Sequence, residues 1–260
     1  MKLNIVPARA GFQWVKLGLL TFSRQPLALA GLFFMYITVA TLLSLLPVIG
    51  LVLALAIVPA ATLGLMAATQ EAEKGRFPMP TVLISAFRAG RQRLRAMLVL
   101  GGLYAAACIA VMVIVSAVVD MPKTQAAGAA AMMTAEFRTA LLLGSLLYLP
   151  ISLMFWHAPA LVHWHGISPV KSLFFSLVAC LRNAKAMLMF GLAWTGVIFI
   201  ISLLIVLIAV MTSNPQVAAT ALMPLGLLVT SMFSTSLYFT FRDSFVATPE
   251  PELPSPGDPA

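Results

Sequence analysis

The sequence predicts an all-α, polytopic membrane protein with six transmembrane helices, arranged as three hairpins that each follow a cytoplasmic amphipathic helix. Of its 260 residues, 61% are hydrophobic and 9% are charged, whereas soluble domains are roughly 25% charged. No formal charge occurs between Arg24 and Glu71, or between Lys185 and Arg242. A bilayer solvates such stretches directly, and a helix of about 20 residues crosses its hydrocarbon core.

Charged and turn-forming residues divide residues 1–245, a single transmembrane domain, into these spans. Pro47 and Gly50 split the first uncharged stretch, and Asn214 and Pro215 split the last. The third span ends before Asp120. The predicted spans are residues 27–46, 50–69, 96–119, 139–162, 187–211 and 218–241.

The Lys and Arg residues predict which way the spans point. Fourteen of the 16 lie before the first span, after the sixth, or in the second and fourth loops, and only Lys123 and Arg138 lie on the other side. Cytoplasmic loops carry such an excess, so both termini are expected in the cytoplasm. Because the cations follow membrane topology rather than forming one patch, we expect no nucleic-acid partner.

Three cytoplasmic segments place apolar residues on one helical side and cations on much of the rest. In residues 169–185, Val170, Phe174 and Leu181 lie apart from Lys171 and Lys185. Residues 80–95 show the same pattern, and residues 11–24 show it less cleanly. Such helices lie in the headgroup plane with their cations toward anionic lipid. We therefore expect membrane lipids, anionic at the cytoplasmic face, as partners. A protein partner or a homo-oligomer stays open.

Landmarks recur between these segments. Pro80 stands 13 residues before Arg93, and Pro169 stands 13 residues before Arg182. The second span of each hairpin also carries a proline, at Pro59, Pro150 and Pro224. A threefold repeat of one surface helix and one hairpin would explain these landmarks. They are explained equally well if every cytoplasmic loop that leads into a span simply ends in a cation.

No Asp, Glu, Lys or Arg lies in the middle of a predicted span, which argues against ion-coupled transport. His157 is the exception among ionisable residues. It is either a proton or substrate contact, or a neutral histidine bonded to a neighbouring group, and we favour the second. His163 and His165 flank Trp164, but helical residues two apart point in different directions, and no Cys or carboxylate is near. We expect no metal there, and Trp164 is expected to anchor the span at the interface.

Hydroxyl residues of the sixth span, among them Thr230 and Ser234, either line a polar pathway or join helices. We favour helix packing, and we read close packing at Gly101 and Gly102 as well. Arg242 and Asp243 are expected to end the span as a stop signal with its own counter-charge. No motif for a cofactor or for catalysis is present, so we expect no enzyme.

The segment from Trp164 and His165 through Gly166-Ile167-Ser168-Pro169, followed by Arg182 and Asn183, resembles the signature of an uncharacterised family of betaproteobacterial inner-membrane proteins. Val6-Pro7-Ala8-Arg9 and the closing Arg242-Asp243 are similar to the same family, so the resemblance covers roughly residues 5–245. It implies a bacterial inner membrane and brings no established activity.

These observations favour a non-enzymatic membrane protein that organises lipid or a partner through its surface helices. The alternative is a transporter or channel for a weakly polar or lipid-like substrate. A water-filled midplane cavity faced by His157 and the hydroxyls of the sixth span would favour transport, and a sealed bundle would favour a scaffold. Residues 246–260 hold five prolines, three acids and no base, which predicts a disordered acidic tail.

Overall fold

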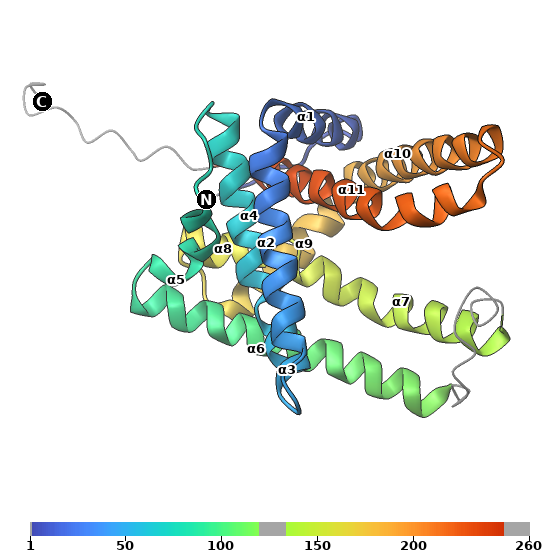
Figure 1. Ribbon diagram of the computed structural model, residues 1–260. Coiled ribbons are helices and arrows are strands. Elements are labelled where there is room, and N and C mark those ends of the chain that lie inside the picture. Colours follow the sequence, from blue (N-terminus) through green and yellow to red (C-terminus); the bar gives the residue numbers. More distant parts are fainter. Residues whose placement is uncertain (1, 120–133, 247–260) are drawn as a thin grey trace, which may run out of the picture.

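The computed structural model describes residues 2–119 and 134–246 (Figure 1). Six helical stretches in these residues are long and apolar enough to cross a membrane. They are Pro26–Ser44, Gly50–Glu73, Arg91–Val118, Ala135–His165, Ala184–Met211 and Thr220–Ser244. The predicted all-α polytopic membrane class is confirmed. The acidic tail predicted after Val246 lies outside the described residues.

The elements follow the order β1 (Lys2–Leu3), α1 (Ala10–Arg24), α2 (Pro26–Ser44), α3 (Gly50–Ala56), α4 (Val58–Glu73), the 3-10 helix η1 (Pro80–Ile84), α5 (Ser85–Arg88), α6 (Arg91–Val118), α7 (Ala135–Phe155), α8 (Ala158–His165), α9 (Pro169–Arg182), α10 (Ala184–Met211), α11 (Pro215–Ser244) and β2 (Phe245–Val246). Strand β1 pairs antiparallel with β2, with Lys2 opposite Val246. This pairing places the N-terminal segment beside the end of α11.

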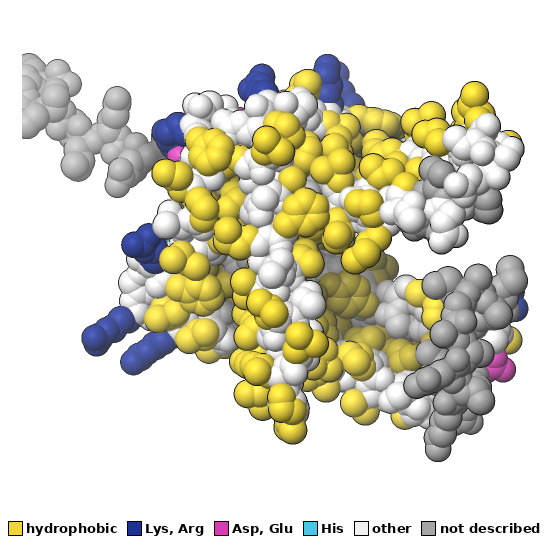
Figure 2. Space-filling view, in the orientation of Figure 1, with side chains coloured by type: hydrophobic (Ala, Val, Ile, Leu, Met, Phe, Trp, Pro, Cys, Tyr) yellow, Lys and Arg dark blue, Asp and Glu magenta, His cyan; other side chains and the backbone are white. Residues whose placement is uncertain are grey.

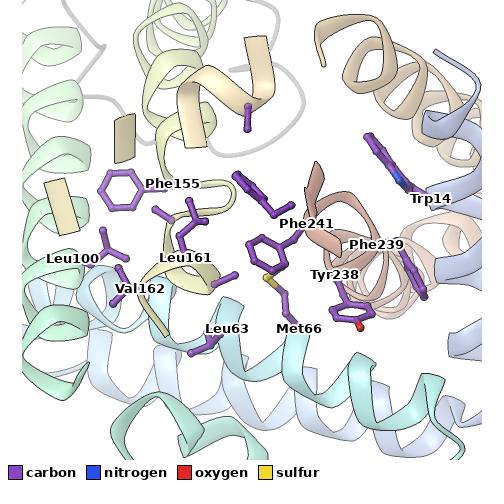
Figure 3. Close-up of a cluster of buried hydrophobic side chains, with 14 of the residues drawn as sticks. Trp14, Leu63, Met66, Leu100, Phe155, Leu161, Val162, Tyr238, Phe239 and Phe241 are labelled. Carbon is purple, nitrogen blue, oxygen red and sulfur yellow. The ribbon is translucent and has the colours of Figure 1, made fainter. Parts of the chain in front are cut away.

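The long helices diverge from a shared base (Figure 1). We call α6 with α7 the α6–α7 arm, and α10 with α11 the α10–α11 arm, because the helices of each pair pack on one another. Helix α1 packs across α10 and α11, and α9 packs against α7 and α8. The core lies where these elements meet, with Phe155, Leu161 and Phe241 from different helices close together (Figure 3).

Burial falls away from this base toward the arms. In the most apolar 18-residue stretch of α3–α4, 44% of the residues are buried. In the most apolar 18-residue stretch of α10, only 11% of the residues are buried. A helix that is hydrophobic all round and yet exposed in the protein must be covered by lipid. The α10–α11 arm therefore presents most of α10 to the bilayer.

Two of the candidate spans are broken rather than continuous. Helices α3 and α4 meet at Ile57, two residues before Pro59, and α7 and α8 meet at Trp156 and His157, just before Pro159. Proline has no N–H for the helical ladder and crowds the preceding turn, so a break at this position is expected. Pro150, in contrast, lies inside α7 without ending it.

The segment 80–95 differs from the single surface helix predicted for it. It forms η1, the one-turn α5 and, after Gly90, the first turn of α6. Gly90 has a φ of 94°, a conformation that residues with a side chain rarely adopt. The chain therefore turns at Gly90, and Arg91 and Arg95 belong to the long helix.

Candidate functional site

A buried amide between α9 and α10 holds the N-terminal segment of the chain. Asn183 is 2% exposed and stands between the two helices. Its Oδ1 accepts a hydrogen bond from the backbone N–H of Val6 (2.9 Å), and its Nδ2 donates to the carbonyl of Asn4 (3.1 Å). A buried amide is stable only when its polar atoms are paired. Asn183 thus fixes where the segment before α1 crosses the bundle.

Charged residues at the end of α11 join it to α1 and α4. Arg242 pairs with Glu73 at the end of α4 and with its neighbour Asp243 (2.8 Å). The second carboxylate oxygen of Asp243 accepts a hydrogen bond from the indole Nε1 of Trp14 (2.8 Å). The Arg242 guanidinium also lies 4.9 Å from the ring centre of Phe239. Arg242 and Asp243 therefore connect three helices, which is more than a stop signal does.

His157 lies at the break between α7 and α8 and is 1% exposed. Its ring packs against Phe241 and Phe245, with ring centres 6.0 Å and 5.4 Å away. Its backbone N–H donates to the hydroxyl of Ser176 in α9 (2.9 Å), and that hydroxyl donates to the carbonyl of Leu153 (2.7 Å). Ser176 thereby replaces the helical hydrogen bond from residue 157 to residue 153 that the break removes.

Trp164 and His165 lie with His157 around one ring from another helix. Their ring centres are 5.1 Å and 5.9 Å from that of Phe241 in α11. This is an aromatic cluster rather than a set of metal ligands. Within residues 2–119 and 134–246, no three His, Cys, Asp or Glu side chains are grouped to hold a metal ion.

Most hydroxyl groups of α11 donate hydrogen bonds to backbone carbonyls of the same helix. Thr230 and Ser234 donate to carbonyls of their own helix, three or four residues back, at 2.8 Å and 2.7 Å. Such bonds satisfy a hydroxyl without a partner helix or a polar pathway. Two other hydroxyls of α11 accept indole N–H groups, Ser236 from Trp194 (3.2 Å) and Thr240 from Trp156 (3.1 Å).

A pocket of about 300 Å³ lies between the two arms, which are separated by an open gap in Figure 2. We call it the inter-arm pocket. The phenol oxygens of Tyr104 in α6 and Tyr148 in α7 lie 2.7 Å apart at its wall. Pro59 and Pro159 both line the pocket, so the breaks in both interrupted spans lie beside it. Its lining residues are Val58, Pro59, Thr62, Tyr104, Tyr148, Ser152, Phe155, Trp156, Pro159, Phe233 and Leu237.

Helix α9 packs its small side chains inward and leaves its bulky ones outside. The buried residues are Ser172, Ser176, Ala179 and Cys180. The bulky residues Val170, Phe174 and Leu181 are 70%, 62% and 59% exposed. The cations Lys171, Arg182 and Lys185 are exposed beside them. Burial raises the pKa of the Cys180 thiol to about 12.

The structure thus brings the predicted positions into separate groups. Asn183, Arg242 and Asp243 bind the termini to the bundle, His157, Trp164 and His165 surround Phe241, and Arg182 lies on the exposed surface of α9. Sequence reasoning missed several contacting residues because they are distant in the chain. These are Trp14, Glu73, Tyr148, Ser176 and Phe241.

Comparison with known proteins gives one informative match. No protein-family model matches the chain, and no solved structure matches it. A protein of Burkholderia thailandensis described as a "probable inner membrane protein" is 36% identical over 270 aligned positions. The alignment covers 99% of this chain and 100% of the relative.

Proposed function

The chain belongs to the same family of inner-membrane proteins as this Burkholderia relative, and from that premise we propose that it is a non-enzymatic protein that organises anionic lipid through α9. A multi-pass protein of the inner membrane meets such lipid at its cytoplasmic face. The proposal places α9, and with it both chain termini, at that face.

The exposed side of α9 carries the proposal. Bulky apolar residues such as Phe174 extend from the protein at 62% exposure, and the cations Lys171 and Arg182 lie on the same helix. A helix in the headgroup plane buries such apolar side chains among the acyl chains and directs its cations at lipid phosphates. Ser176 and Cys180 bond the Leu153 carbonyl from the opposite side of α9, so the bulky apolar side chains face away from the bundle.

The geometry supports the alternative of a polar transport pathway less well. His157 is packed against Phe241 and Phe245, and Thr230 and Ser234 bond carbonyls of their own helix. The gap between the arms is bordered mainly by apolar side chains, which favour lipid over water. A lipid-like substrate therefore fits the alternative better than an ion does.

Lipid analysis of the purified protein tests the proposal. We expect phosphatidylglycerol and cardiolipin to be enriched over the bulk membrane when lipids that co-purify with the full chain are measured by mass spectrometry. The variant Lys171→Gln/Arg182→Gln/Lys185→Gln should lose most of that enrichment, since each cation near an anionic surface contributes about 1 kcal/mol.

A matched variant removes the same charge elsewhere. Arg88→Gln/Arg91→Gln/Arg93→Gln changes the exposed cations of α5 and the start of α6. It should retain more of the enrichment, because residues 80–95 do not form a single surface helix like α9. An equal loss in both variants would mean that total charge, and not α9, retains the lipid, and that result would contradict the proposal.

A further inference from the structure

We propose that the inter-arm pocket binds an uncharged membrane lipid with a flat, carbonyl-bearing head, the chemistry of an isoprenoid quinone. The pocket is built by α4, α6, α7, α8 and α11. It shares no lining residue with α9, so the proposal is independent of the one for that helix.

The boundaries of the third span imply that the pocket lies near the middle of the bilayer. Tyr104 follows Arg95 by nine residues in the continuous helix α6. At 1.5 Å per residue this is about 14 Å, close to half of the ~30 Å hydrocarbon core. A ligand at this depth is surrounded by hydrocarbon, so it must be largely apolar and its few polar atoms must lie where the pocket can bond them.

The inter-arm pocket opens laterally to the bilayer, between the two arms. Tyr148 and Ser152 of α7 line the pocket on one arm, and Phe233 and Leu237 of α11 line it on the other. Figure 2 shows the surface hollowed between these arms. Tyr148 is 39% exposed, so a molecule within the bilayer can reach its side chain without crossing the protein.

The two phenols leave a hydrogen-bond donor for a guest. Tyr104 and Tyr148 share one hydrogen bond, in which either can be the donor. Each phenol has one O–H, so the phenol that accepts still has a proton to donate. The neighbouring Cys108 offers Tyr104 only a sulfur atom, which is a weak acceptor. In hydrocarbon an unpaired O–H is costly, and a carbonyl oxygen would satisfy it.

The rest of the lining selects against a phospholipid headgroup. All eleven lining residues are uncharged, and a phosphate would be buried without a counter-charge. The rings of Phe155, Trp156 and Phe233 instead offer aromatic faces and edges, with the Trp156 and Phe233 ring centres 6.1 Å apart. A flat ring packs well in such surroundings, and 300 Å³ is at the lower end of the size of small-molecule sites.

Fluorescence titration tests this inference. Decylubiquinone is added to the full-length protein in lipid nanodiscs, and its quenching of tryptophan emission is followed, because Trp156 lines the pocket. We expect saturable quenching that decylbenzene, which has the same tail without carbonyls, does not displace. The double variant Tyr104→Phe/Tyr148→Phe, which removes both phenol O–H groups, should raise the Kd about tenfold, the effect of losing one neutral hydrogen bond. Tyr238→Phe, which changes a tyrosine outside the pocket, should leave the Kd unchanged.

Three results would overturn the inference: quenching that does not saturate or equals that of collisions in the bilayer, displacement by decylbenzene at equal concentration, or an unchanged Kd in Tyr104→Phe/Tyr148→Phe. If the double variant does not fold, the competition between decylubiquinone and decylbenzene on the unaltered protein decides between the two outcomes.

Discussion

A single hydroxyl completes the backbone hydrogen bonding at the break between α7 and α8. The break leaves the N–H of His157 and the carbonyl of Leu153 without their helical partners, and Ser176 bonds both. The site is buried, so water cannot take the place of the hydroxyl. These two hydrogen bonds explain why a polar residue is buried on α9.

Removal of this hydroxyl should destabilise the protein. In Ser176→Ala the buried N–H of His157 loses its partner and the Leu153 carbonyl keeps only the Cys180 thiol (3.7 Å), a weak donor, at a cost of about 1–3 kcal/mol. Ser172→Ala is the matched control, because Ser172 is equally buried on α9 but bonds only the Pro169 carbonyl of its own helix. The free energy of unfolding, measured by denaturant titration in detergent, should fall clearly more for Ser176→Ala. Equal losses would show that Ser176 does not complete the break.

Two adjacent glycines of α6 should respond in opposite ways to alanine. A Cβ at Gly101 would collide with the carbonyl oxygen of Ala56 at the end of α3, whereas one at Gly102 would meet nothing within 4 Å. Gly101→Ala should therefore cost about 1–3 kcal/mol, and Gly102→Ala should be neutral or stabilise the helix by up to ~1 kcal/mol. Thermal unfolding in detergent measures both, and a stable Gly101→Ala variant would contradict the packing of α6 on α3.

At the scale of elements, the sequence predicts which segments are helical better than it predicts which way they face. Residues 169–182 form a helix, but its side against the bundle consists of small residues such as Ser172 and Ala179. In a membrane, bulky apolar side chains are satisfied by lipid, so helices meet through small residues instead. A helical wheel alone does not separate these two environments.

Thiol labelling checks the orientation of α9. Burial raises the pKa of Cys180 to about 12, so only a very small fraction of its thiol is in the reactive thiolate form between pH 7 and 9. Cys180 should therefore resist maleimide between pH 7 and 9 and react only after unfolding. In Lys171→Cys, at an exposed position of α9, the new thiol should react quickly and faster as pH rises toward the ordinary thiol pKa of about 8.5. Rapid labelling of Cys180 in the folded protein would show that α9 faces the other way.

Interruptions of the helices were harder to predict than their existence. Charge-free stretches indicate spans because lipid excludes charge, and the six candidate helices lie close to the predicted ranges. Among the prolines, Pro59 and Pro159 stand beside breaks while Pro150 does not. Whether a helix breaks depends on a partner for the freed backbone groups, here Ser176, and that partner is distant in the sequence.

At the scale of the whole molecule, the sequence predicted the number of spans but not how they diverge. The arms separate because α7 packs on α6 and α9 while α11 packs on α10, α1 and α4. These contacts join residues far apart in the chain, such as Trp14 with Asp243. The inter-arm pocket follows from this divergence, and no local motif could have indicated it.

The Lys and Arg side chains are also distributed unevenly between the base of the molecule and the tips of the arms. In Figure 2 most of the visible Lys and Arg side chains lie at the base and few at the tips of the arms. The pairing of β1 with β2 places the N-terminal segment and the end of α11 together. We expect this base to be cytoplasmic, because cytoplasmic loops retain Lys and Arg.

Labelling of engineered cysteines on either side of the membrane tests this topology most directly. With Cys108 and Cys180 replaced by alanine, Arg91→Cys and Lys123→Cys are exposed separately to a membrane-impermeant maleimide in spheroplasts. We predict that Lys123→Cys is labelled in intact spheroplasts and that Arg91→Cys is labelled only after lysis. Labelling of both from the same side would contradict the six-span topology on which the roles of α9 and the inter-arm pocket depend.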